Sequence, residues 1–184
     1  MLGLGNSLIS SSKIKTLHFS YQSDFTSDDN SWTKDSFFHN GTPTITPNQG
    51  TGDAADGTGW LKIVYGADQT SFPFSGSITK NMLSHGDSFL PNDNVVVSFK
   101  VKLIYNGVDD HWSGTDDVTL SFGGYNPAGS QNIPLNTTTT VSDNSGPLTV
   151  ETNRDVFISF ALSGDKPTSG ATWYLKDYSI QVFR

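Results

Sequence analysis

Cysteine is absent from this sequence of 184 residues. The chain therefore forms neither disulfide bonds nor zinc sites with thiolate ligands. No stretch approaches the roughly 18–20 apolar residues of a membrane-spanning helix. Basic residues are also scarce, with 11 Lys and Arg against 18 Asp and Glu and a formal net charge of −7. Because phosphate groups would repel such a surface, we expect neither nucleic acid nor a membrane as a partner.

Aromatic and turn-forming residues are abundant instead. Aromatic side chains make up 12% of the chain and glycine contributes 18 residues, a composition typical of β-proteins with polar loops. Apolar and polar residues alternate along several segments, whereas no window shows a sustained 3.6-residue repeat. In 95–105, one face of the predicted strand carries Val97, Phe99, Val101, Leu103 and Tyr105. The same alternation over 118–122 and 156–162 predicts two further half-buried strands.

The remaining segments complete an all-β prediction. Shorter strands are expected at 16–21, 60–65, 76–79 and 147–150, and turn clusters at 48–59, 106–117, 123–130 and 163–170. Six to nine short strands joined by long polar loops favour an antiparallel β-sandwich or jelly roll. We place a domain boundary near Lys13, which separates an extended N-terminal arm (1–13) from one β-sandwich domain (14–184).

The closing segment WYLKDYSIQVFR, residues 173–184, changes phase within the predicted strand. Trp173 and Leu175 share one phase, whereas the other phase holds Tyr178, Ile180 and Val182. A shift by one residue would turn every later side chain to the opposite face unless the strand bulges. The sequence therefore predicts a β-bulge at Lys176-Asp177, where the carboxylate would accept hydrogen bonds from unpaired backbone donors.

Three segments resemble the carbohydrate-binding-module jelly rolls, a galactose-binding-like family. They are the opening DFTSDDNSW at 24–32, the strand WLKIVY at 60–65 and the aromatic ending at 173–182. The resemblance spans roughly residues 16–184 and implies a jelly-roll fold. Two acidic positions of the family pattern differ here, since Thr26 and Lys176 stand where acids are expected.

The resemblance also implies a structural calcium ion between the opening loop and the closing strand. The ligands that it implies are Asp24, Asp28, Asp29 and Asp177. Calcium takes about 6–8 oxygen ligands, whereas Lys176 and Thr26 put a cation and a neutral group where acids would help. The alternative is a bulge without metal. The residues themselves require no cofactor.

A second acidic loop, 108–117, combines carboxylates with an aromatic ring in the manner of sugar sites. The predicted glycan ligands are Asp109, Asp110, His111, Trp112 and Tyr125. The alternative is that Trp112 covers the core beneath a long loop. Neither an HExxH nor a GxSxG motif is present, and no pair of carboxylates stands out as a glycosidase pair. We therefore expect a protein that is not an enzyme.

The first residues, MLGLGNSLIS, lack the basic start of a signal peptide and are expected to belong to the mature chain. They resemble the openings of small structural proteins of tailed phages. The apolar side chains expected to dock this arm onto a neighbouring subunit are Leu2, Leu4, Leu8 and Ile9. This resemblance implies a virion structural protein of the capsid-decoration, head-fibre or tail-fibre type.

The predicted partners of such a virion protein are other virion proteins, further copies of itself in a homotrimer, and glycans bound for host adhesion. The alternative is a free-standing, secreted carbohydrate-binding module of a polysaccharide-degrading system, with an extracellular location.

Overall fold

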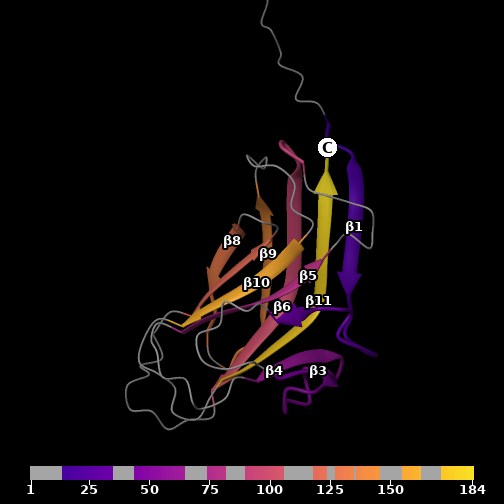
Figure 1. Cartoon of the computed structure of the whole chain (residues 1–184). Coiled ribbons are helices and arrows are strands. Elements are labelled where there is room, and N and C mark those ends of the chain that lie inside the picture. The colour runs from indigo at the N-terminus through magenta and orange to yellow at the C-terminus, as the bar shows by residue number, and fades with distance from the viewer. Residues whose placement is uncertain are drawn as a thin grey trace, which may run out of the picture.

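The structure is a computed structural model that describes residues 14–34, 44–64, 74–81, 90–105, 118–123, 127–134, 136–145, 155–162 and 171–184. All regular elements in these ranges are strands (Figure 1). They are β1 (Leu17–Ser23), β2 (Thr33–Lys34), β3 (Thr44–Gln49), β4 (Trp60–Val64), β5 (Phe74–Asn81), β6 (Asn94–Tyr105), β7 (Val118–Gly123), β8 (Pro127–Asn132), β9 (Thr139–Ser145), β10 (Asp155–Leu162) and β11 (Ala171–Phe183). No helix able to cross a membrane occurs in the described ranges.

The strands form two antiparallel sheets, which confirms the predicted β-sandwich. One sheet has the order β3-β4-β11-β6-β9, with β1 also paired to β11, and the other has the order β2-β5-β10-β7-β8. The first and last described strands therefore lie side by side (Figure 1). β11 pairs with β6 along one side, while its other side pairs first with β4 and then with β1.

The core lies between the sheets and follows the predicted alternation. On β6, the side chains of Val95, Val97, Phe99, Val101 and Leu103 are at most 1% exposed. Leu61 and Ile63 on β4 join them, and Ile78 on β5 packs from the opposite sheet. Burying such side chains removes apolar surface from water, which is the main force holding the sheets together.

The predicted bulge in β11 is present. Lys176 and Ser179 lie opposite Lys100 and Ser98 of β6, so three steps along β11 match two steps along β6. The extra residue leaves Asp177 with a φ of 54°. Side chains on both sides of the bulge consequently face the core, and all of them are buried: Trp173, Leu175, Tyr178, Ile180 and Val182.

The bulge differs from the prediction in how its aspartate is used. The Asp177 carboxylate pairs with the Lys100 ammonium at 2.8 Å, and both side chains are nearly half exposed. Among the described residues no backbone N–H donates to it. The expected strand at 147–150 lies outside the described residues. The described ranges alone contain eleven strands, more than predicted, and β8 occupies part of the expected turn at 123–130.

Candidate functional site

A polar hollow of about 610 Å³ lies at one edge of the sandwich, between β1 of one sheet and β5 of the other. The loop that follows β1, residues 24–32, forms its rim. The residues that line it are Tyr21, Gln22, Asp24, Ser27, Asp28, Asn30, Ser31 and Lys80. We refer to this feature as the edge hollow.

The rim of the edge hollow is anchored from below by aromatic side chains. Phe25 and Trp32 are both buried, and the Trp32 ring meets the Tyr178 ring edge-on at 4.9 Å between centroids. Trp32 Nε1 donates to Ser23 Oγ at 2.9 Å, and Tyr21 Oη lies 2.7 Å from the same atom. These contacts fix the two ends of the 24–32 loop, because Ser23 directly precedes it and Trp32 is its last residue.

The carboxylates of the rim shape the loop through local hydrogen bonds. Asp28 Oδ1 accepts from the backbone N–H of Asn30 at 2.7 Å and from its side-chain amide at 2.6 Å. Asp24 Oδ1 accepts from the backbone N–H of Thr26 at 3.1 Å. Such side-chain-to-backbone bonds stabilise turns. They allow Asn30 and Ser31 to hold positive φ angles of 52° and 60°.

One cation lies beneath this rim. The Lys80 side chain reaches from β5, is only 5% exposed as a residue, and donates to the Asn30 carbonyl oxygen. Its ammonium also lies 4.8 Å from the centre of the Tyr21 ring, within cation–π range. The edge hollow thus combines an aromatic ring, amides, hydroxyls and two exposed carboxylates above a buried ammonium, which are groups suited to hydroxyl-rich ligands.

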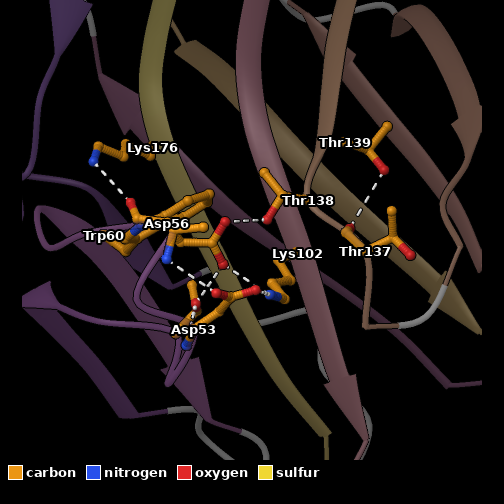
Figure 2. Close-up of polar contacts among 10 residues, drawn as sticks. Asp53, Asp56, Trp60, Lys102, Thr137, Thr138, Thr139 and Lys176 are labelled. Atoms are coloured by element: carbon orange, nitrogen blue, oxygen red, sulfur yellow. Dashed lines mark hydrogen bonds and ion pairs between the residues drawn. The ribbon is translucent and has the colours of Figure 1, made fainter.

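A second polar cluster lies on the outer face of the six-stranded sheet, where the loop of residues 50–59 folds over β6 and β11 (Figure 2). Lys102 Nζ lies 2.7 Å from Asp56 Oδ2 and 3.6 Å from Asp53 Oδ2. The Asp56 carboxylate also accepts hydrogen bonds from the hydroxyls of Thr51 and Thr138. Both side chains of the Asp56–Lys102 pair are less than 10% exposed.

The electrostatics of this pair follow from its partners. Burial alone would raise the pKa of Asp56, but the hydrogen bonds from Lys102, Thr138 and Thr51 outweigh it and lower the pKa from 3.8 to about 2. The hydrogen bond to Asp56 raises the pKa of Lys102, against the opposing effect of burial. Both groups therefore stay charged near neutral pH, and the pair fastens the loop to the sheet.

The same loop is held at a second point by Trp60 and Lys176. Trp60 is 1% exposed, and its Nε1 donates to the Asp56 carbonyl oxygen at 3.1 Å. Lys176 Nζ donates to the Thr58 carbonyl oxygen at 2.6 Å. It also lies 5.6 Å from the centre of the Trp60 ring, and Figure 2 shows the two side chains near each other. Trp60 and Lys176 therefore hold the backbone of residues 56–58, while the Asp56 side chain binds Lys102.

The structure separates the residues expected to bind calcium. Asp24 and Asp28 lie on the rim of the edge hollow, and Asp29 accepts from the backbone N–H of Ser31 at 2.9 Å. Asp177 instead lies at the β11 bulge, paired with Lys100. Within the described ranges no three acidic or histidine side chains gather as metal ligands would. As placed, these carboxylates do not fit a calcium ion.

The other predicted sites fall outside the described residues. These are the glycan ligands Asp109, Asp110, His111, Trp112 and Tyr125, and the arm residues Leu2, Leu4, Leu8 and Ile9. Conversely, the sequence did not indicate Tyr21, Gln22, Asn30 and Lys80. The one available signal was that Lys80 directly follows the predicted strand 76–79. Its partner Asn30 is 50 positions away and could not be paired with it.

No protein-family model matches the sequence, and no curated protein sequence matches it. Solved structures match its fold. The C-terminal family 22 carbohydrate-binding module of Clostridium thermocellum Xyn10B aligns with a TM-score of 0.51 and 11% identity, over 89% of this chain and 92% of that one. A xylan-binding domain of the same module family gives a TM-score of 0.52 and 10% identity, over 89% and 93%.

A third match comes from another module family. CBM27-1 of Caldicellulosiruptor saccharolyticus, solved in complex with mannohexaose, aligns with a TM-score of 0.53 and 14% identity, over 88% of this chain and 96% of that one. At such identities the likeness concerns the fold alone. The chain thus has the jelly-roll fold found in carbohydrate-binding modules.

Proposed function

We propose that this chain is a non-catalytic glycan-binding module and that the edge hollow is its sugar site. The observation that carries the proposal is the lining of the hollow, where amides, hydroxyls and carboxylates surround the half-buried Tyr21 ring. Sugar recognition needs such groups, because carboxylates and amides bind the hydroxyls while a ring packs against the carbon skeleton. The fold supports the proposal, since the three matched structures described above are carbohydrate-binding modules.

The charge of the hollow favours a neutral glycan. Asp24 and Asp28 are exposed, whereas the Lys80 ammonium is buried and already bound to the Asn30 carbonyl oxygen. A ligand would therefore meet negative charge first, and the whole chain carries a formal charge of −7. Uronic or sulfated sugars would be repelled. A volume of about 610 Å³ lies within the range of small-ligand pockets and suits a short oligosaccharide segment.

The two carboxylates of the edge hollow, Asp24 and Asp28, are arranged for binding and not for catalysis. A glycosidase needs one carboxyl kept protonated by an apolar setting and a second one facing it across the scissile bond. In the edge hollow, Asp24 and Asp28 are both exposed, and each has one oxygen committed to a turn of the loop. They are therefore suited to accept hydrogen bonds from sugar hydroxyls rather than to deliver a proton.

The proposal is tested by screening the full chain against an array of neutral and acidic glycans, followed by calorimetry on each hit. Gln22→Ala and Asp28→Asn should each weaken binding about 5- to 30-fold, because one hydrogen bond to a sugar is worth roughly 1–2 kcal/mol. Gln181→Ala is the matched control, since Gln181 is exposed on β11 and does not line the hollow.

The outcomes separate the parts of the proposal. If Trp112→Ala abolishes binding while the hollow variants bind normally, the module function stands and the location is wrong. If the wild-type chain binds no glycan on the array, the function itself is refuted. Binding of acidic glycans only would refute the charge argument.

The virion setting predicted from the sequence belongs to the same proposal. It rests on the arm of residues 1–13, which lies outside the described residues. Light scattering on the full chain and on a chain starting at Lys13 tests it. An oligomer that becomes monomeric on truncation supports an assembly arm, whereas two monomers favour the free-standing secreted module.

A further inference from the structure

The two positions where the family pattern expects acids are brought together in space. A methyl group placed on Gly59 would lie 3.3 Å from Cγ2 of Thr26 and 3.8 Å from Cε of Lys176. It would also lie 3.8 Å from the Asp24 carbonyl oxygen. The opening loop, the 50–59 loop and the closing strand therefore converge around Gly59. Thr26 and Lys176, the two departures from the pattern, both lie at this convergence.

The Lys176 ammonium is surrounded there by groups that attract a cation. Its Nζ lies 2.6 Å from the Thr58 carbonyl oxygen and 3.4 Å from that of Asp56. The Trp60 ring adds a cation–π contact at 5.6 Å from its centre. Gly57 and Gly59, with φ angles of 66° and 86°, give the backbone the left-handed conformations of this turn. Backbone carbonyls of this kind are also typical ligands of a calcium ion.

We propose that the Lys176 ammonium takes the place of a structural calcium ion and joins the loop of residues 50–59 to the closing strand. A dication and an ammonium repel each other and cannot share the same carbonyl oxygens. The carboxylates that calcium would need are committed elsewhere, three to backbone N–H groups of their own loop and Asp177 to Lys100. A tethered ammonium makes stability independent of metal concentration, because no free ligand has to bind.

The presence of Thr26 and Lys176 in place of two acids is consistent with a site that holds an ammonium and no metal. An acid at position 176 would place negative charge beside the carbonyl oxygens of Asp56 and Thr58, and one at position 26 would add negative charge beside Gly59. A bound cation would be needed to compensate such charge. Thr26 removes one such charge, and Lys176 supplies the positive charge directly. The calcium expected from the resemblance and the two departures from it thus have one physical explanation.

Thermal unfolding with calcium chloride and with a chelator tests this inference. The wild-type Tm should move by less than about 1 °C between the two conditions. Lys176→Met should lower the Tm by roughly 2–6 °C in both, because it keeps the apolar stem but removes the charge. The double variant Thr26→Asp/Lys176→Asp restores both acids and should gain at least about 5 °C on addition of calcium chloride but not of magnesium chloride.

Each alternative result overturns the inference. A wild-type Tm that rises with calcium would show that the chain binds the metal despite Lys176. A Lys176→Met variant as stable as the wild type would show that the ammonium does not stabilise the contact between the 50–59 loop and the closing strand. A folded double variant that calcium does not stabilise would show that the region around Gly59 is not a cation-binding site. If the double variant does not fold with or without calcium, Lys176→Asp alone replaces it under the same criteria.

Discussion

Replacing Asp56 by Asn should destabilise the protein at neutral pH and leave its stability nearly unchanged in acid. The substitution keeps the size of the side chain but removes the charge that faces Lys102 at 2.7 Å. The Lys102 side chain is only 8% exposed, so its ammonium cannot turn to water for compensation. An uncompensated buried charge is costly, although Asp53 at 3.6 Å would still offset part of the loss.

The magnitude follows from the pKa of Asp56, which falls from 3.8 to about 2 on folding. A shift of one pKa unit corresponds to about 1.4 kcal/mol, so the ionised carboxylate contributes about 2 kcal/mol to the free energy of unfolding at pH 7. Because the folded-state pKa is the lower one, this contribution is complete above pH 3.8. It disappears as the pH falls through about 2.

Urea denaturation of wild type and Asp56→Asn between pH 7 and pH 2 measures this difference. Asp53→Asn is the matched control, since Asp53 is 55% exposed and its pair with Lys102 should contribute less than about 0.5 kcal/mol. Equal losses for the two variants would refute the argument from burial. A loss for Asp56→Asn that persists unchanged at pH 2 would refute the assignment to an ionised carboxylate.

Three further substitutions test the packing around the same strands. Tyr178→Phe should raise the free energy of unfolding by about 1 kcal/mol, because the fully buried hydroxyl finds no hydrogen-bond partner among the described residues. A loss of stability in urea would show that the hydroxyl has a partner. Gly59→Ala should lower the free energy of unfolding by about 1–3 kcal/mol, and by more than Gly52→Ala, since both residues have positive φ but only Gly59 is close to Thr26. Equal losses would show that backbone strain alone explains the effect. Asp177→Gly should change the free energy of unfolding by less than about 0.5 kcal/mol, because Gly adopts a φ of 54° freely and the lost ion pair is exposed. A larger loss in thermal unfolding would show that the ion pair with Lys100 stabilises the fold.

The features that could be predicted from the sequence are those that depend on local periodicity. Alternation of apolar and polar residues identified β6 and β10. The change of phase in 173–182 placed the bulge at Lys176-Asp177, and the register shifts between Lys176 and Ser179. Strands without that pattern were missed. β3 contains Pro47, and β8 and β9 consist mostly of small or polar residues that also occur in turns.

The candidate site was harder to predict because its residues meet only through the sheet topology. Lys102 and Asp56 are 46 positions apart, and Lys80 and Asn30 are 50 apart. No local pattern marks either pair, since a lysine in a strand is normally exposed to solvent. The acidic opening loop was recognised, but its carboxylates were expected on a metal. In the structure they form turns beside a hollow that lies between β1 and β5, two strands of different sheets.

The bulge at Asp177 links the two polar regions of the molecule. Before it, β11 pairs with β4 and presents Lys176 to the loop of residues 50–59. After it, β11 pairs with β1, and Tyr21 lies opposite Ile180. Without the extra residue, Ile180 would point away from the core, and so would Tyr21, because directly paired residues share a face. A single inserted residue therefore lets one strand support the fastened loop on the outer face and the aromatic ring of the edge hollow.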